Sequence, residues 1–524
     1  MIDPLYSGGS FGEVLISALQ RFPDRIAFEE EGGRSVTYRE TARQIGRAIA
    51  RLRALGLQPG DTVVQLSGNR SETFFVMAAL YIGGFRSVTL HTLASVDDQA
   101  YIIEDAEAVL VIVDPRYRER AFQLRERLSA ARPERGALQW FAHEAVEGFG
   151  SFWVGDEIAP LSCVGGPEHI IRLAYTGGTT GKPKGVMLSN RSMTTNVVLA
   201  LAGKAWPETV RFLCPTPITH GAGSMIVPTL HHGGTFILQQ GFDKDRVLDA
   251  IAERGVTSLF LVPTMIYTLL DHPRTRTIDF SRLHSLMYGA APMTPARIRE
   301  AIEVFGPVLV QGYGQTEAPN TLLTLTREDH LSPDERRLAS AGRPYPGITL
   351  AVLDDQGQPV AQGEVGEICV RGSLVMTGYW KQPEQTAEAL RNGWLHTGDM
   401  AWQDEQGYYY IVDRKKDMII SGGFNVYPKE IENVLATHPA VASVAVIGVP
   451  DPKWGEAVKA VVVLRPGAQA GEAELIALAR DRKGPVAAPK SVDFVDSLPV
   501  TALGKPDKKV LRARYWGGLQ RAVH

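Results

Sequence analysis

The residues best suited to chemistry form a short loop rich in glycine, threonine and lysine. Residues 175–185 read YTGGTTGKPKG, with four glycines, three threonines and two lysines. Glycines let the backbone approach an anion closely, threonines donate hydrogen bonds and lysines supply positive charge. Lys182 precedes Pro183 rather than a serine or threonine, so the loop is not of the Walker A type. This composition predicts a polyphosphate site; the alternative, on composition alone, is a turn-rich loop exposed to solvent.

Two later clusters carry carboxylates. The sequence QGYGQTE ends at Glu317 after an apolar run, where one carboxylate together with phosphate oxygens could hold Mg²⁺. Tyr313 in the same cluster could stack on a base. The sequence WLHTGD places Asp399 in a predicted turn, where its oxygens could accept two ribose hydroxyls. Taken singly, Glu317 also fits a solvated loop residue and Asp399 an Asx-turn.

Short β-rich runs alternate with amphipathic segments in the first part of the chain. The pattern predicts strands over residues 61–68 and 108–113 and helices over residues 71–80 and 96–106, with Ser71 as the cap of the former helix. Strand, helix and strand at this spacing predict an α/β fold class, with mostly parallel sheets flanked by helices. In such sheets ligands bind at the carboxyl ends of strands, which is where the loops described above occur.

The predicted pattern of secondary structure changes twice in the second half of the sequence. From about residue 347 it predicts a β-rich subdomain with short connections, and after Arg414 a small α+β unit with a helix beginning at Pro428. We therefore expect a large N-terminal domain over residues 1–414 and a mobile C-terminal domain over residues 415–524.

Composition excludes several classes of protein. The 524 residues carry a net charge of −3, with 44% hydrophobic and 22% charged residues. This balance argues against a mainly disordered chain and gives no electrostatic case for nucleic acid as a partner. Three cysteines cannot build a disulfide framework, and no run of apolar residues is long enough to cross a bilayer, so we expect a cytoplasmic protein. No metal-ligand spacing and no Cys/His arrangement stands out in the sequence.

Six motifs occur in the order found in one known superfamily. They are YTGGTTGKPKG, YGAAP (288–292), GYGQTE, WLHTGD, DRKKDMIISGGFNVYPKEIE (413–432) and PVTALGKPDKK (499–509). Together they cover essentially the whole chain and resemble the adenylate-forming superfamily, which includes acyl-CoA synthetases, aryl-CoA ligases, peptide-synthetase adenylation domains and firefly luciferase. The chain as a whole is most similar in look to bacterial fatty-acyl-CoA synthetases.

The resemblance implies a role for each motif. The residues implied to bind ATP phosphates are Thr176, Gly177, Gly178, Thr179, Thr180, Gly181, Lys184 and Thr316, with Glu317 on Mg²⁺. Those implied to flank adenine are Gly289, Ala290, Ala291 and Tyr313, and those implied to hold the ribose are Asp399 and Arg414. Lys505 would be the catalytic lysine, Lys416 the hinge, and Gly422 and Gly423 the lining of the tunnel for the pantetheine arm of CoA.

The implied reaction has two steps. A carboxylic acid attacks the α-phosphate of ATP to give acyl-AMP and pyrophosphate, and CoA then takes the acyl group to give a thioester and AMP. A positioned lysine and Mg²⁺ suit the negative charge that builds up in the first step. This predicts an AMP-forming acid–CoA ligase that uses ATP, Mg²⁺ and CoA, with a homodimer left open.

The residue at the expected carboxylate position narrows the acid. His220 matches the catalytic position that guards the carboxylate in acyl- and aryl-CoA ligases, although by itself it also fits a core histidine. Amino-acid-activating relatives have an Asp next to it, where this chain has Gly221, so an ammonium would lack its partner. The expected acyl pocket (220–225, 288–291 and 318–323) is small or apolar, which predicts a hydrophobic monocarboxylate, fatty or aromatic.

The chain departs from the superfamily pattern at two positions, and two alternative functions remain. Gly178 stands where relatives usually have Ser, and Lys416 stands where many have Asp, which leaves ATP affinity and hinge energetics open. One alternative is a stand-alone adenylating enzyme that passes the acyl group to a carrier protein, or to oxygen as luciferase does. The other is a non-catalytic binding protein that keeps the fold.

Overall fold

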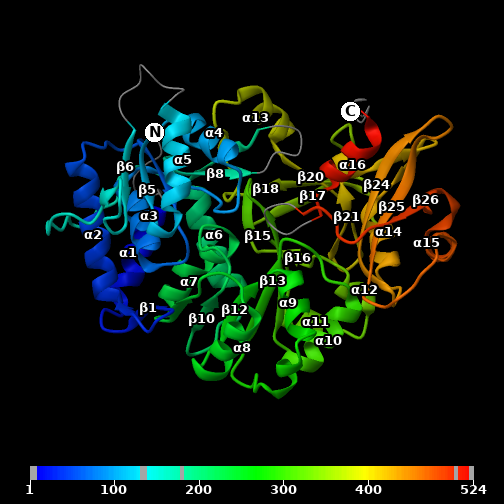
Figure 1. The fold of residues 1–524 in the computed structure, drawn as a ribbon, viewed down its shortest axis with the longest axis horizontal. Coiled ribbons are helices and arrows are strands. Elements are labelled where there is room, and N and C mark those ends of the chain that lie inside the picture. Colours follow the sequence, from blue (N-terminus) through cyan, green and yellow to red (C-terminus); the bar gives the residue numbers. More distant parts are fainter. Residues whose placement is uncertain (1–8, 130–137, 177–181, 501–505, 518–524) are drawn as a thin grey trace. The chain divides into compact units, whose positions relative to one another are not determined.

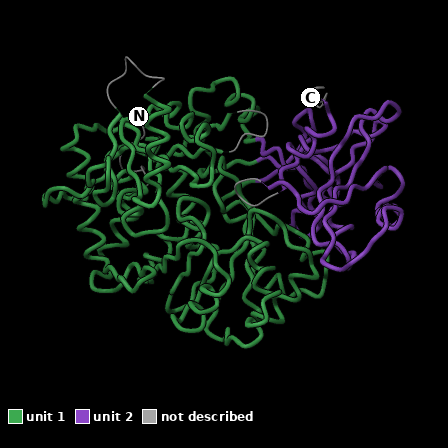
Figure 2. Tube along the Cα trace, viewed as in Figure 1, with its two compact units in different colours: residues 1–349, 370–395 green, residues 350–369, 396–524 purple. Residues whose placement is uncertain are grey.

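The computed structural model describes residues 9–129, 138–176, 182–500 and 506–517. Five segments lie outside the described residues, among them residues 177–181 of the glycine-rich loop and residues 501–505, which include Lys505. The chain divides into two compact units, one of residues 1–349 and 370–395 and the other of residues 350–369 and 396–524 (Figure 2).

The first unit contains a sheet of nine strands, parallel except at its two edges (Figure 1). From one edge to the other its strands are β16 (Arg343–Pro344), β15 (Ala318–Leu325), β14 (Leu309–Gln315), β13 (Ser285–Gly289), β12 (Ser258–Leu261), β10 (Arg211–Cys214), β11 (Thr235–Leu238), β1 (Ile26–Glu30) and β2 (Ser35–Thr37).

A second sheet of the same unit has eight strands, again mostly parallel. In order they are β19 (Gly378–Tyr379), β9 (Lys184–Ser189), β8 (Ile170–Thr176), β4 (Arg86–Thr89), β3 (Thr62–Leu66), β5 (Ala108–Val113), β6 (Gln139–Ala142) and β7 (Gly150–Ser151). The helices of this unit are α1 (Phe11–Arg21), α2 (Tyr38–Ala54), α3 (Ser71–Gly83), α4 (Val96–Asp105), α5 (Arg118–Ser129), α6 (Asn190–Gly203), α7 (Ile226–His231), α8 (Lys244–Glu253), α9 (Pro263–Leu270), α10 (Pro295–Phe305), α11 (Arg327–His330), α12 (Glu335–Leu338) and α13 (Pro383–Ala389).

Helices α2 and α3 lie between the two sheets of the first unit. Helix α2 contacts β1 and β2 of the larger sheet, α3 contacts β4 and β8 of the smaller sheet, and the two helices pack against each other. All 13 residues of α3 are buried, and after a polar first turn its sequence SETFFVMAALYIG has no polar face. A helix that is apolar all round must be covered on every side, which the position between two sheets provides.

The second unit contains two small sheets. One has the order β17 (Thr349–Leu353), β18 (Gly366–Arg371), β20 (Leu395–Gln403) and β21 (Tyr409–Arg414). The other has the order β23 (Phe424–Val426), β22 (Ile419–Ser421), β25 (Gly455–Leu464) and β24 (Val441–Asp451), with β26 (Ser491–Phe494) paired to β25. Its helices are α14 (Pro428–Leu435), α15 (Glu472–Ala487) and α16 (Lys508–Trp516).

Strand alternation explains how the larger of these sheets is covered on two faces. On β24, Val446 joins the core formed with α14 and α15, whereas its neighbours Ala445 and Ile447 join a separate core with Leu511 of α16. Successive side chains of a strand point to opposite faces, so helices on both faces bury the whole apolar strand.

The predicted α/β fold class is confirmed, and two local predictions are wrong. Helix α3 begins at Ser71, but its N-cap is Arg70, whose side chain makes no capping hydrogen bond; the backbone N–H of Ser71 instead donates to Oε1 of Glu30 at 2.9 Å. Asp399 lies inside strand β20 rather than in a turn, and it is paired with Arg414, the last residue of β21. Among the described residues, no helix is both long and apolar enough to cross a membrane.

Candidate active site

The glycine-rich loop connects two antiparallel strands. Strand β8 ends at Thr176 and strand β9 begins at Lys184, and these two residues are paired in the sheet. The intervening residues Gly177, Gly178, Thr179, Thr180 and Gly181, all predicted to bind phosphate, lie outside the described residues. The hairpin therefore fixes the base of the loop and presents the hydroxyl of Thr176 and the ammonium of Lys184 at the same end of the sheet.

Tyr175 anchors the entrance to this loop. Its phenol donates a hydrogen bond of 2.6 Å to Oδ2 of Asp105, the last residue of α4. Burial, and then the hydrogen bond and charge of Asp105, raise the pKa of Tyr175 far above its usual value. The hydroxyl stays protonated at any physiological pH, so the hydrogen bond from Tyr175 to Asp105 persists.

Tyr379 joins the glycine-rich loop to the carboxylate predicted to bind Mg²⁺. Glu317 lies in the short turn between β14 and β15, and its Oε1 accepts a 2.9 Å hydrogen bond from the Tyr379 hydroxyl. The Nζ of Lys184 lies 5.2 Å from the centre of the same ring. Strand β19, which carries Tyr379, pairs with β9. One tyrosine thus contacts a cation and an anion from two motifs that are far apart in sequence.

The residues predicted to flank adenine end two neighbouring parallel strands. Gly289 ends β13 and is paired with Gly312 of β14, one residue before Tyr313. A Cβ on Gly289 would lie 2.5 Å from the carbonyl oxygen of Gly312, so only glycine fits there. Ala290 follows with φ of 66°, a left-handed conformation that is costly for a residue with a Cβ. This is the carboxyl end of the sheet, where α/β folds bind ligands.

Tyr288 does not line a pocket, contrary to expectation. Its side chain is fully buried, and its hydroxyl lies 3.1 Å from Oε1 of Gln311 and 2.9 Å from Nε2 of His330. The side chain therefore belongs to the core under β13. The contribution of this segment to any acyl pocket comes from the residues that follow Tyr288.

His220 is held as a neutral imidazole. It caps the short 3₁₀ helix Gly221–Met225, and its Nδ1 lies 2.9 Å from Oγ1 of Thr219. Burial, with smaller contributions from His91 and Arg172, lowers the pKa of His220 to about 3. Part of its surface stays accessible to solvent. An uncharged ring with an accessible face can offer a hydrogen bond without forming an ion pair.

His91 is a neighbour of His220 that sequence reasoning missed. It follows β4, and its ring meets the ring of His220 edge to face, with 5.0 Å between the centroids. Its Nδ1 accepts the backbone N–H of Leu93, which leaves the proton on Nε2. Burial also lowers the pKa of His91. The pair is therefore two neutral rings rather than two cations.

Asp399 and Arg414 form an ion pair within the second unit. They are paired residues of β20 and β21, with 2.6 Å between Nε of Arg414 and Oδ1 of Asp399. The Asp399 side chain is 5% exposed, whereas that of Arg414 is 46% exposed. Strand register alone brings the carboxylate and the guanidinium together, as their predicted joint role on the ribose requires.

Glu367, Cys369 and His396 form a cluster behind Asp399 that the sequence did not reveal. Their ligand atoms lie within 4.8 Å of one another, with Nδ1 of His396 3.1 Å from Oε2 of Glu367 and 3.4 Å from Sγ of Cys369. The environment does not favour a cation. Oε1 of Glu367 accepts the N–H of Gly398, and Nζ of Lys415 lies 3.6 Å from Oε2. The cluster is better described as a carboxylate enclosed by donors.

The predicted hinge and tunnel residues lie in short elements of the second unit. Lys416 lies in the 3₁₀ helix Lys415–Asp417, and burial, followed by the charge of Arg414, lowers its pKa. Gly422 and Gly423 connect β22 to β23 with φ of 59° and 84°. The N–H of Gly422 donates to the carbonyl oxygen of Trp454 at 2.8 Å. Lys505 lies outside the described residues.

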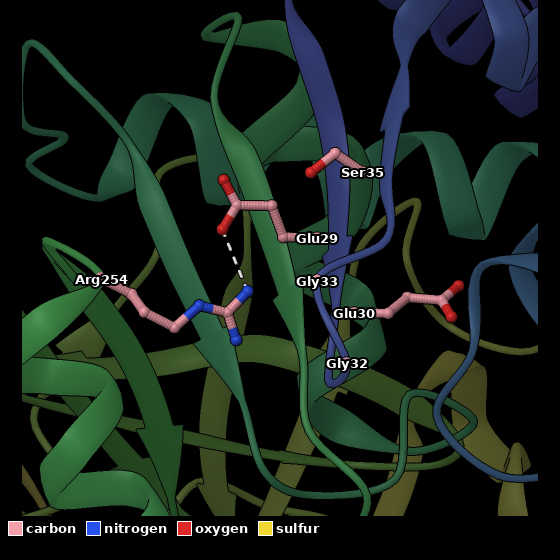
Figure 3. A pocket seen from close by; sticks show the side chains of 6 residues that line it. All are labelled: Glu29, Glu30, Gly32, Gly33, Ser35 and Arg254. Carbon is pink, nitrogen blue, oxygen red and sulfur yellow. Dashed lines mark hydrogen bonds and ion pairs between the residues drawn. The ribbon is translucent and has the colours of Figure 1, made fainter.

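A surface hollow near the β1–β2 turn contains none of the motif residues (Figure 3). It is lined by Glu29, Glu30, Gly32, Gly33, Ser35 and Arg254. Glu29 accepts hydrogen bonds from Arg254 and from Arg211, so the main charges of the hollow neutralise one another. This hollow is best explained by the packing of the turn.

Comparison with known proteins identifies the class of protein. The AMP-binding enzyme family matches residues 16–380, and the AMP-binding enzyme C-terminal domain matches residues 430–505. The chain therefore belongs to the AMP-binding enzyme family, which confirms the predicted adenylate-forming superfamily.

Particular relatives are acid–CoA ligases and an amide bond synthetase. The chain is 45% identical to the medium/long-chain-fatty-acid–CoA ligase FadD8 of Mycobacterium tuberculosis, over 98% of this chain and 91% of that protein. It is 40% identical to a feruloyl-CoA synthase of Amycolatopsis, over 92% and 95% of the two chains. The structure of the amide bond synthetase McbA from Marinactinospora thermotolerans matches with a TM-score of 0.88 and 35% identity, over 96% of this chain and 99% of that one.

Proposed function

We propose that the protein is an AMP-forming acid–CoA ligase that activates a hydrophobic monocarboxylic acid, fatty or aromatic. The observation that carries this proposal is the contact of Tyr379 with both Lys184 and Glu317, which brings a phosphate-binding cation beside a metal-binding carboxylate. Relatives that act on fatty and on aromatic acids, at 45% and 40% identity, support the range of acids. We place the protein in the cytoplasm, and a homodimer stays open.

The first step needs an anionic nucleophile and a stabilised leaving group. The neutral ring of His220 donates a hydrogen bond to the acid without neutralising its carboxylate, which keeps the carboxylate nucleophilic. The ammonium of Lys184 and the residues from Thr176 to Gly181 bind the β- and γ-phosphates, and Thr316 binds a phosphate oxygen. Glu317 would hold Mg²⁺, which when bound offsets phosphate charge. Lys505 stabilises the charge that develops as the acid attacks the α-phosphate.

Residues elsewhere fix the nucleoside. Gly289, Ala290, Ala291 and Tyr313 flank the adenine, and the absence of a Cβ at Gly289 lets β13 and β14 approach closely where these residues lie. The ribose hydroxyls donate hydrogen bonds to the Asp399 carboxylate, which is also ion-paired with the Arg414 guanidinium. Proximity and orientation of this kind account for a large part of catalysis in two-substrate reactions.

The second step needs a thiol near the acyl-adenylate. We assign Gly422 and Gly423 to the path of the pantetheine arm, because two consecutive glycines with positive φ present backbone rather than side chains. Lys416 is assigned to the hinge between residues 1–414 and 415–524, where rotation withdraws Lys505 and exposes the adenylate to CoA. One chain could then serve both steps.

A second candidate is transfer of the acyl group to another acceptor. A fatty acid–[acyl-carrier-protein] ligase of Streptomyces coeruleorubidus is 33% identical over 94% of this chain, and the amide bond synthetase matches almost the whole structure. The test is AMP release from ATP and Mg²⁺ with a panel of fatty, benzoic and cinnamic acids, each with and without CoA. CoA-stimulated AMP release with one class of acid is expected. Acid-dependent pyrophosphate release that ignores CoA would contradict the ligase and favour the second candidate.

A further inference from the structure

We propose that Glu367 is a positioning residue for the ribose-binding carboxylate Asp399. It acts through the backbone of Gly398 and the charge of Lys415. Both residues lie within the motifs, but neither has been given a role above. The inference rests on the proposed function in one respect, the assignment of Asp399 to the ribose. All of the residues involved lie in the second unit.

The first observation is a hydrogen bond to the peptide that precedes Asp399. Oε1 of Glu367 accepts the N–H of Gly398 at 2.9 Å. Gly398 has φ of 72°, a conformation open to glycine and costly for other residues. An extended strand would not present this N–H to β18 in the same way, so the carboxylate holds the local kink that sets the direction of the Asp399 side chain.

The second observation is that the neighbouring peptides are fixed by the same pair of strands. The Thr397 hydroxyl donates to the carbonyl oxygen of Ile368 at 2.7 Å, and the N–H of Asp399 donates to that hydroxyl at 3.1 Å. Thr397 and Gly398 thereby bond directly to β18, and Asp399 is linked to it through the Thr397 hydroxyl. Glu367 supplies the one charged member of this set.

The third observation is how the buried charge of Glu367 is compensated. Glu367 is 5% exposed, and an uncompensated carboxylate at such a site would be very costly. Nδ1 of His396 contacts Oε2 at 3.1 Å, and Nζ of Lys415 lies 3.6 Å from the same oxygen. Lys415 follows Arg414 directly in the chain. The Nζ of Lys415 also donates to Oδ1 of Asp355 at 2.6 Å. Glu367 thus holds the peptide before Asp399 directly and contacts the residue after Arg414 through the side chain of that residue.

The consequence is a specific pattern of loss. Glu367→Gln keeps the size of the side chain but removes the charge that attracts Lys415 and strengthens the bond to Gly398. The effect on nucleotide binding should appear only when the nucleotide carries the hydroxyls that Asp399 contacts. A general loss of structure would instead weaken every nucleotide alike.

The experiment measures calorimetric binding of ATP and of 2′,3′-dideoxy-ATP to the full-length protein, with no acid required. Wild type should bind ATP at least about tenfold more tightly than dideoxy-ATP, the worth of hydrogen bonds to a charged acceptor. Glu367→Gln should weaken ATP binding about tenfold and leave dideoxy-ATP binding unchanged, so that the preference for the ribose hydroxyls disappears. Glu364→Gln, the same change at an exposed position three residues earlier, should behave as wild type.

Further variants separate the possible failures. If Asp399→Asn already lacks the preference, Glu367→Gln added to it should have no further effect on either nucleotide. Equal weakening of both nucleotides by Glu367→Gln, or no weakening, would overturn the positioning role while leaving Asp399 as a ribose ligand. A wild type that does not distinguish the two nucleotides would overturn both assignments. Should Glu367→Gln fail to fold, Lys415→Met, which removes a half-buried cation, tests the same pattern with a smaller expected loss.

Discussion

Two regions of the molecule treat titratable side chains in opposite ways. Around His220, burial and then the neighbouring His91 and Arg172 lower the pKa to about 3, and no carboxylate of the described residues offsets them. Around Asp399, a carboxylate whose side chain is 5% exposed keeps Arg414 at 2.6 Å as a counter-ion. Packing without a counter-charge yields a neutral group, and packing with one yields an ion pair. The two regions therefore suit different partners, an acid that must stay anionic and a ribose that must be held.

The neutrality of His220 means that cationic charge on the reacting phosphate must come from elsewhere, and Lys505 is the predicted source. We expect Lys505→Ala to slow acyl-adenylate formation by about 10³-fold and to spare thioester formation from supplied acyl-adenylate. Pyrophosphate release and CoA-thioester formation, measured separately, test this. Lys509→Ala on exposed α16 is the control, and equal loss in both half-reactions would refute the division.

Removing the counter-ion of Asp399 should leave a buried group without a counter-charge, as at His220. Arg414→Met leaves the Asp399 carboxylate without its 2.6 Å partner, so we expect the KM for ATP to rise by roughly 30- to 100-fold. Initial-rate measurements at saturating acid and CoA give this value. Arg480→Met, at an exposed position of α15, should change it by less than about twofold; a similar rise there would mean that net charge, rather than the ion pair, governs binding.

Adding an anion beside His220 should give that histidine a counter-charge, as Arg414 does for Asp399. His91→Asp places a carboxylate where a neutral ring now meets His220, which raises the pKa of His220. As pH falls below that raised pKa, the ring becomes cationic and pairs with the substrate carboxylate, so adenylation should drop about tenfold by about pH 5.5. The pH profile of pyrophosphate release measures this. His91→Asn should show no such acidic limb, and neither should wild type from His220.

The glycine pair of the second unit offers an internal control for thioester formation. A Cβ on Gly422 would lie 2.6 Å from Cε3 of Trp454, whereas a Cβ on Gly423 meets nothing within 4 Å. Both glycines have positive φ, so both alanine variants carry backbone strain, but only Gly422→Ala adds a clash. We expect the KM for CoA to rise about fivefold more for Gly422→Ala than for Gly423→Ala. Adenylation should be unaffected, and equal effects of the two variants would contradict a role for close packing.

A histidine whose burial outweighs the effect of nearby carboxylates should also affect stability, as His143 shows. Burial lowers the pKa of His143 to about 4, well below its unfolded value of about 6.5. Below that unfolded value the unfolded chain binds the proton that the native chain excludes, so the free energy of unfolding falls as pH drops from about 6.5 towards 4. We expect His143→Gln to remove about 1–2 kcal/mol of this pH dependence between pH 7 and pH 5. Urea titrations at the two pH values measure it; an unchanged pH dependence would contradict the prediction.

Local pattern predicted much of the fold, because short apolar runs bounded by turn residues depend little on distant contacts. The strand predicted over residues 108–113 is β5, and the helix predicted at Pro428 is α14. The helix predicted over residues 96–106 ends one residue earlier, at Asp105. Asp399 was predicted in a turn because the sequence does not show that this residue pairs with Arg414 of β21.

The residues that sequence reasoning missed share one property: their importance comes from sheet pairing. Tyr379 lies beside Lys184 because β19 is paired to β9, and Glu367 contacts Gly398 because β18 is paired to β20. His91 meets His220 across 129 positions of sequence. No spacing rule within one segment reveals such contacts. The motif residues, by contrast, were found from short segments whose order matched the superfamily, and their roles remain predictions.

The helix enclosed between the two sheets of the first unit limits how this chain can vary. All 13 residues of α3 are buried, and its one charged residue, Glu72, is paired with Arg34 and Arg70, so a charged replacement at any other position would lose solvation without such partners. A helix with one exposed face can drift in sequence on that face, but α3 has no such face. The same enclosure means that its amide hydrogens exchange with solvent only when the two sheets separate, so α3 reports on the unfolding of the first unit as a whole.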